Sequence, residues 1–240
     1  MTETVNAEPV VISAETPSIK ENIVERKTIV YEANIDPTVI RVSGEKLKQQ
    51  LFTRFGLFKP KSDEIQFISL DKYYEPYIVI SGKYFLDYYR KCTYVFKVDE
   101  RVREVVLLNH KFMPETSKSS RIIKLNGEER LIKEAKAFLI LDKKGSDATV
   151  DHLPSAPSEK KPEKVISEFK IEELSENVDV NFVRGRIAEH PKDVSRIVEE
   201  VFEITDRSVI YTPRFKLLFK NLKTNEEKVM VIDGVTSKKI

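Results

Sequence analysis

The sequence predicts an α+β protein built of two β-rich modules, each with antiparallel strands and at least one packed helix. Several short segments alternate apolar and polar residues, which is the period of a half-buried strand. Other segments repeat apolar residues at positions i, i+3 and i+4, which is the period of a helix with one buried face. A stretch with three prolines, residues 153–162, separates a larger body from a smaller one.

Size and composition suit a globular protein. Of the 240 residues, 40% are hydrophobic and 33% are charged, which excludes a wholly disordered chain. The net charge of +2 neither demands nor forbids a polyanionic partner. The longest apolar stretches are far shorter than a membrane-spanning helix needs, and the first residues lack the basic start of a signal peptide. With Cys92 as the one cysteine, no internal disulfide can form, so we expect a cytoplasmic protein without membrane association.

Four segments are predicted along the chain. Residues 1–26 form a flexible acidic tail, with five glutamates against two basic residues. Residues 27–152 form the larger β-rich module, residues 153–162 the proline-rich linker, and residues 163–240 a smaller helix-plus-hairpin module. A linker at this place predicts that the smaller module folds when it is expressed alone.

The larger module begins with a short strand at residues 27–31 and a helix at residues 44–55. Leu47, Leu51 and Phe55 share one face of that helix, and Ser43 is its candidate N-cap. Strands are predicted at residues 65–70, 77–81, 93–98, 104–109, 121–125, 130–133, 137–141 and 149–150. The dipeptide Asn126-Gly127 predicts a hairpin turn, and residues 142–145 predict a second turn.

The smaller module begins with helices around residues 165–169 and 180–187. The strongest helical pattern follows Pro191, with apolar residues at 194, 197, 198, 201 and 202. Strands are predicted at residues 209–211, 214–220 and 228–232, with turns at residues 221–226 and 233–234. Both modules contain a Tyr-x-Pro motif before a strand, at residues 74–76 and 211–213. An internal duplication would explain that motif, and so would the independent occurrence of the same residues at the start of two unrelated strands.

The last residues resemble a known type of module. The segments 211–219, 224–228 and 232–238 are similar to the helix-then-hairpin ending of PepSY-like and other cystatin-like modules. Those modules often end in Asp-Gly-x-Thr-Gly, where this chain has Ser237 in place of the last glycine. The resemblance implies a helix-on-sheet module used for binding or inhibition, and it implies no catalytic residues. The chain as a whole also resembles uncharacterised archaeal proteins.

The motifs of catalysis and metal binding are missing. His110, His152 and His190 lie about 40 residues apart, without a His-Glu-x-x-His or Cys-x-x-Cys motif. The sequence has no Gly-x-Ser-x-Gly elbow and no phosphate-binding loop, and Cys92 lies beside a strand pattern. We therefore expect no metal, no cofactor and no enzymatic activity. A hydrolase whose site is assembled from distant residues remains a third alternative.

Tyrosines are concentrated in one stretch. Seven of the nine lie between residues 73 and 94, interleaved with basic residues, and the candidate binding surface comprises Tyr73, Tyr74, Tyr77, Tyr84, Tyr88, Tyr89, Arg90 and Lys91. Tyrosine offers a large rigid contact area with a polar tip, so we expect at least three of the seven rings to be exposed. The competing interpretation is that these tyrosines are ordinary strand residues, half-buried at the rim of a sheet.

A second candidate surface is a basic cluster of Arg184, Arg186, Lys192 and Arg196, for which a solvated helix face is the competing interpretation. Together these features favour a non-enzymatic intracellular binding or adaptor protein that acts through a protein–protein surface. The alternative is a nucleic-acid or ribosome-associated factor that uses the tyrosine stretch and the basic cluster. The sequence makes no prediction of the oligomeric state.

Overall fold

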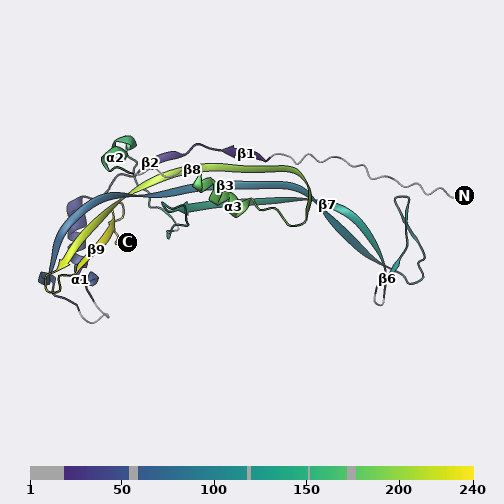
Figure 1. Ribbon diagram of the computed structural model, residues 1–240, viewed down its shortest axis with the longest axis horizontal. Helices are drawn as coiled ribbons and strands as arrows, with labels where there is room; N and C mark the ends of the chain where they lie inside the picture. Colours follow the sequence, from purple (N-terminus) through teal and green to yellow (C-terminus); the bar gives the residue numbers. More distant parts are fainter. Residues whose placement is uncertain (1–18, 54–58, 118–119, 151, 172–176) are drawn as a thin grey trace. The chain divides into compact units, whose positions relative to one another are not determined.

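The computed structural model describes residues 19–53, 59–117, 120–150, 152–171 and 177–240 (Figure 1). Most of the predicted acidic tail, and Phe55 of the predicted helix, lie outside the described residues. The helices and strands within them are β1 Lys20–Ile23, β2 Lys27–Val30, α1 Pro37–Leu51, a 3-10 turn Ser62–Glu64, β3 Ile65–Val98, β4 Val105–Leu107, β5 His110–Phe112, β6 Glu115–Ser117, β7 Ser120–Leu141, α2 Pro162–Glu168, α3 Val178–Ile187, β8 Val194–Asn221 and β9 Glu227–Asp233.

Seven of the strands form one mixed sheet in the order β1-β8-β3-β7-β6, with β2 and β9 also paired to β8. β2 runs parallel to β8, with Lys27 opposite Ser208, whereas β9 runs antiparallel to it, with Asp233 opposite Arg214. β4 and β5 form a separate two-stranded hairpin. The predicted α+β class is therefore confirmed in its broad sense.

The chain divides into two compact units. Unit 1 comprises residues 1–22, 83–136 and 187–203, and unit 2 comprises residues 23–82, 137–186 and 204–240. The predicted arrangement of two modules is not confirmed, because each unit combines segments from both sides of residues 153–162. Within unit 2 that proline-rich segment is bonded to β2: Glu159 N donates to Val30 O over 2.7 Å.

The main core of unit 2 lies between α1 and the β8–β9 hairpin. Its buried residues are Ile40, Phe52, Ile65, Phe215, Leu217, Phe219, Met230 and Ile232. α1 begins seven residues before the predicted helix, because Asp36 is its N-cap and accepts a bond from Thr38 N over 2.7 Å, and Pro37 occupies its first turn. Ser43 is therefore an interior residue of the helix, and the predicted N-cap is wrong.

The predicted helix at residues 194–202 is wrong, because this segment is the first part of β8. Its apolar spacing fits a helix, but every second residue is buried, as in a strand: Glu200, Phe202 and Ile204 are buried, and the residues between them are half-buried. Valine and isoleucine dominate its apolar positions, and these β-branched residues favour strands. Pairing with distant strands therefore overrides the local helical period.

The predicted hairpin at Asn126-Gly127 is also wrong, since β7 runs through both residues. Among the described glycines only Gly145 has a positive φ, so Gly127 does not adopt the conformation of a type I′ turn. That geometry occurs instead between β4 and β5, where Leu108 has φ 48° and Asn109 has φ 66°. The strands predicted at residues 65–70, 77–81 and 93–98 are likewise parts of one longer strand, β3. Residues 149–150, which were also predicted to be a strand, form none.

Other local predictions are confirmed. α2 and α3 coincide with the two predicted helices, and Val180, Val183 and Ile187 of α3 are buried as its pattern indicates. The turn after β7 is closed by Gly145 N, which donates to Asp142 O over 3.0 Å. The β8–β9 hairpin also has its predicted loop.

Candidate functional site

The tyrosine stretch does not form one exposed surface. Tyr73, Tyr74 and Tyr77 belong to unit 2, whereas Tyr84, Tyr88, Tyr89, Arg90, Lys91 and Tyr94 belong to unit 1. Tyr74, Tyr77, Tyr84 and Tyr88 are buried, Tyr73 and Tyr89 are half-buried, and only Tyr94 is exposed. The expectation of at least three exposed rings is wrong, because β3 is covered on the face toward which Tyr84, Leu86 and Tyr88 point.

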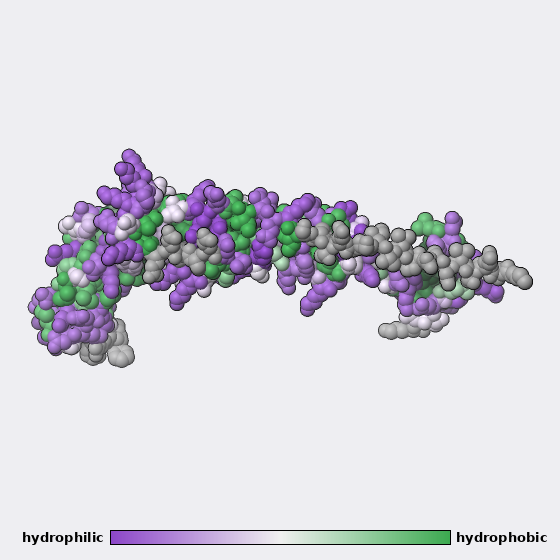
Figure 2. Space-filling view, turned by 45° about the horizontal axis from the view of Figure 1, so that its top comes forward, coloured by the Kyte–Doolittle hydropathy of each residue, from purple (hydrophilic) through white to green (hydrophobic). Residues whose placement is uncertain are grey.

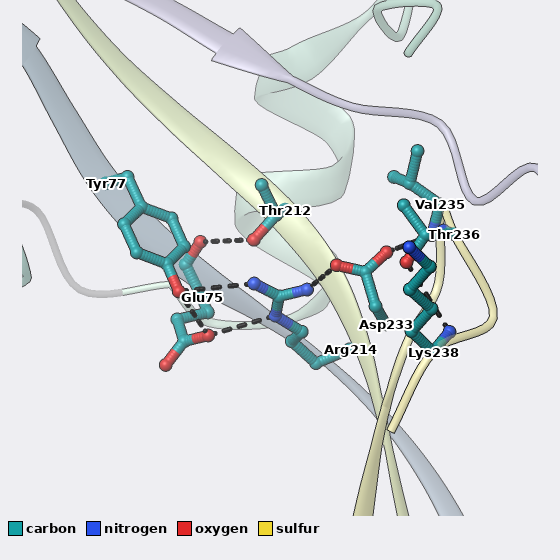
Figure 3. A network of polar contacts seen from close by, with 8 residues as sticks. All are labelled: Glu75, Tyr77, Thr212, Arg214, Asp233, Val235, Thr236 and Lys238. Carbon is teal, nitrogen blue, oxygen red and sulfur yellow. Dashed lines mark hydrogen bonds and ion pairs between the residues drawn. The ribbon is translucent and has the colours of Figure 1, made fainter. Parts of the chain in front are cut away.

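In unit 2, the two Tyr-x-Pro motifs meet in a buried polar network (Figure 3). Arg214 of β8 is 3% exposed, and its guanidinium bonds Glu75 Oε2 at 2.9 Å, the Tyr77 hydroxyl at 3.2 Å and the carboxylate of Asp233. Thr212 Oγ1 also donates to Glu75 O over 3.2 Å. The network thus joins β3, β8 and the end of β9.

This network is structural rather than a ligand site. Each of the three guanidinium nitrogens of Arg214 has a partner within the chain, and the residue is only 3% exposed, so the contacts support a structural role. Asp233 Oδ1 also accepts from the backbone N–H groups of Val235 and Thr236, at 2.8 and 2.7 Å, which fixes the turn after β9. Burial raises the pKa of Tyr77, which keeps its phenol protonated at neutral pH.

In unit 1, a buried carboxylate connects a histidine and a tyrosine. Glu200 is 3% exposed, and its Oε1 lies 2.9 Å from the Tyr84 hydroxyl and 2.8 Å from His190 Nε2. Burial raises the pKa of Tyr84, so the phenol donates to the carboxylate. An open pocket of about 200 Å³ in the same unit is lined by Tyr84, Glu134 and Val201, among others, but not by His190 or Glu200.

His190 and Glu200 are connected by hydrogen bonds to Tyr84, and neither of the two lines this pocket. Nucleophilic catalysis needs a nucleophile within reach of the base and a pocket that holds both. The hydrogen bonds of this pair connect it to Tyr84, whose raised pKa makes it a poor nucleophile. Within the described ranges, no group of three His, Cys, Asp or Glu residues could hold a metal ion.

The basic cluster does not assemble in either unit. Arg184 and Arg186 lie on α3 of unit 2, whereas Lys192 and Arg196 lie in unit 1. Arg186 forms an ion pair with Asp147 at 2.5 Å, and the Arg196 guanidinium stacks 4.1 Å from the centre of the Tyr89 ring. These two charges therefore have partners within the chain.

Seven exposed apolar residues of unit 1 lie between residues 94 and 113. They are Tyr94, Val95 and Phe96 of β3, Val106 and Leu107 of β4, Leu108 in the turn, and Met113 after β5. Three consecutive exposed residues of one strand face both sides, so neither face of β3 is covered there. Leu108 is 93% exposed and Met113 is 70% exposed. We call this set the apolar segment.

Figure 2 shows apolar side chains reaching the surface among hydrophilic ones at the end of the view that holds β6. The charges between residues 97 and 113 nearly cancel: Lys97, Arg101, Arg103 and Lys111 against Asp99, Glu100 and Glu104. Arg101 pairs with Asp99 at 3.1 Å and Lys111 with Glu104 at 3.2 Å. The apolar segment thus has nearly neutral surroundings.

The sequence identified Tyr94 as a candidate binding residue but not Leu108. The feature that could have indicated Leu108 is an apolar residue directly before an asparagine, Asn109, in a tight turn.

Comparisons with protein families, with curated proteins and with solved structures found no match to this chain. The resemblance of the last residues to PepSY-like and cystatin-like modules therefore stays a prediction. None of the helices in the described residues has the length and apolar character needed to cross a membrane.

We expect acid to destabilise unit 1. Hydrogen bonds from Arg130 hold the pKa of Asp87 below its usual range, and those from Tyr94 and Arg90 do the same for the pKa of Glu129. A carboxyl whose pKa is lowered by folding stabilises the folded state at neutral pH and loses that contribution as the pH falls through the folded value. The melting temperature, followed by circular dichroism, should therefore drop as the pH falls below about 4.

Asp87→Asn should make this decline shallower, since the variant has one such carboxyl fewer to protonate. Glu100→Gln is the control, because Glu100 is exposed in the same unit. An acid decline that Asp87→Asn leaves as steep as in the unchanged chain would contradict the role given to the Asp87–Arg130 pair.

Proposed function

We propose that this chain is a non-enzymatic binding protein that contacts another protein through the apolar segment of unit 1. The observation that carries the proposal is Leu108, which is 93% exposed in a tight turn with a positive φ. Asparagine and glycine suit such a position, whereas leucine adds backbone strain and exposes an apolar side chain. A side chain that is unfavourable to the isolated fold supports a role in binding.

The surrounding charges favour a protein over a nucleic acid as the partner. Binding to a nucleic acid needs a clear excess of basic residues to neutralise phosphates. Around the apolar segment the charges nearly cancel, and two of the basic residues are paired with acids. A contact surface with an apolar centre and a neutral polar rim is typical of protein–protein interfaces. The cytoplasmic location favoured by the single cysteine belongs to this proposal.

Leu108→Ser should weaken binding of the partner by about 2 kcal/mol, because full burial of a leucine side chain in an interface is worth roughly 1.5 to 3 kcal/mol and serine lacks that apolar surface. The partner is first obtained by affinity purification from the native host, identified by mass spectrometry and prepared in pure form. The dissociation constant is then measured by calorimetry for the unchanged chain, for Leu108→Ser and for Met113→Ser.

The control is Val229→Ser, which removes an exposed apolar side chain from unit 2. It should leave the dissociation constant unchanged. Equal affinity of Leu108→Ser and the unchanged chain would overturn the proposed surface. A loss of affinity by about a thousandfold between 50 and 200 mM salt would instead identify a nucleic-acid partner.

A further inference from the structure

One edge of β7 has no strand partner in unit 1. β6 pairs only with the first residues of β7, as Glu115 lies opposite Ile122 and Ser117 opposite Ser120, and β3 occupies the other side of β7. From residue 123 to residue 136, none of the described strands pairs with the second edge. Its backbone N–H and C=O groups are therefore available to a further strand.

The exposed side chains along this edge alternate in charge. Every second residue of β7 is exposed in this part of the strand, and these residues are Glu128, Arg130, Ile132, Glu134 and Lys136. Their charges are negative, positive, none, negative and positive, so the same row read backwards has the opposite sign at every charged position. Ile132 at the centre is 64% exposed. A row with this symmetry complements a second copy of itself that runs antiparallel.

The charges favour one register of the two antiparallel β7 strands over the adjacent registers. With Ile132 opposite Ile132 of a second copy, Arg130 faces Glu134 and Glu128 faces Lys136, and the two-fold symmetry forms each pair twice. A shift by two residues in one direction places Glu128 opposite Glu134. A shift by two in the other direction places Arg130 opposite Lys136. A shift by one residue turns the exposed side chains to the opposite face.

Contacts within unit 1 hold the first half of this row in place. Arg130 forms two bonds with Asp87, from Nε at 2.9 Å and from Nη2 at 2.5 Å. Glu128 Oε1 accepts from Ser195 Oγ over 3.2 Å. Arg130 also interacts with Tyr89, and Glu128 Oε2 lies 3.9 Å from the guanidinium of Arg196. Two of the four charges are thus ordered before any second copy arrives, which lowers the entropic cost of association.

We propose that two copies of this chain associate through the free edge of β7, with the two-fold axis at Ile132, so that the sheet continues from one copy into the other. This inference uses residues outside the apolar segment and is independent of the proposed function. Backbone hydrogen bonds of the added strands supply attraction, and the charge pattern fixes their register.

Charge reversal tests the register. The mass of the full chain is measured by size-exclusion chromatography with light scattering over a series of concentrations. Glu128→Lys and Lys136→Glu should each raise the dimer dissociation constant by about tenfold or more, because each change makes two symmetric pairs repulsive. The double variant Glu128→Lys with Lys136→Glu should restore the original value to within about threefold. The two residues lie eight positions apart on one strand and cannot touch within one copy, so only pairing between copies explains such a rescue.

Cross-linking tests the position of the axis. In a Cys92→Ser background, Ile132→Cys should form a disulfide-linked dimer under mild oxidation, since the two cysteines lie opposite each other. Glu134→Cys, placed opposite Arg130, should form much less. Leu108→Lys should leave the dimer intact, which separates this interface from the proposed partner surface. A monomer at all concentrations, single reversals without effect, or no rescue in the double variant would overturn the proposal.

Discussion

Arg214→Met should lower the free energy of unfolding by about 3 to 5 kcal/mol, measured by urea denaturation followed by circular dichroism. The guanidinium of Arg214 is the cation that faces the buried Asp233 and one oxygen of Glu75. Removing it leaves the Asp233 carboxylate, which is 6% exposed, without that charge partner. The penalty is that of a buried unpaired charge, which greatly exceeds the value of an exposed ion pair.

Two further variants separate this cause from a general loss of packing. Lys216→Met on the same strand removes an exposed cation and should change the free energy of unfolding by less than about 0.5 kcal/mol. Adding Asp233→Asn to Arg214→Met should recover part of the loss, because the neutral amide keeps an oxygen for Val235 N and Thr236 N. A loss below about 1 kcal/mol for Arg214→Met would show that the network contributes little.

Phe219→Ala should cost a similar amount, about 3 to 5 kcal/mol, because it opens a cavity in the core of unit 2. The Phe219 side chain is fully buried, and its ring meets that of Phe67 edge to face at 5.7 Å. Both the lost burial and the lost contacts with its neighbours contribute. The measurement is the urea midpoint at constant slope.

Phe138→Ala is the matched control, since Phe138 belongs to the same unit but is 63% exposed. The same chemical change there should shift the free energy of unfolding by less than about 0.5 kcal/mol. Equal effects of the two substitutions would show that Phe219 does not belong to the cooperative core.

The sequence predicted those parts of the fold that local chemistry decides. The helices α2 and α3 and the β8–β9 hairpin follow from apolar periods and turn residues within a few positions of each other. The start of α1 was also readable, since Asp36 followed by Pro37 is a recognised helix entry. The regular apolar positions Leu47, Leu51 and Phe55 begin later and indicate Ser43 instead.

The long strands were not predictable in this way, because their continuity depends on partners far away in the sequence. Residues 194–202 have a helical pattern but form the first part of a strand, because β8 pairs with β3. Asn126-Gly127 has the composition of a turn and lies inside β7 for the same reason.

The candidate sites were also predictable only where they depend on local sequence, and not where they depend on distant residues. The tyrosines were found from composition, but their burial depends on which face of β3 is covered. Leu108 was missed because its exposure follows from a turn that the sequence did not predict. The partners of Arg214 come from two other strands, β3 and β9, and no spacing in the sequence connects Glu75, Arg214 and Asp233.

The parallel pairing of β2 with β8 has a consequence for synthesis on the ribosome. Lys27–Val30 must wait for Ser208–Tyr211, which emerge after most of the chain has been translated. Until then α1 has no Leu217 or Phe219 to cover its apolar face. Contacts this distant in sequence make folding slow and leave apolar surface open to chaperones and to aggregation. Unit 2 should therefore acquire resistance to protease only after β8 has left the exit tunnel, which arrested chains of increasing length would show.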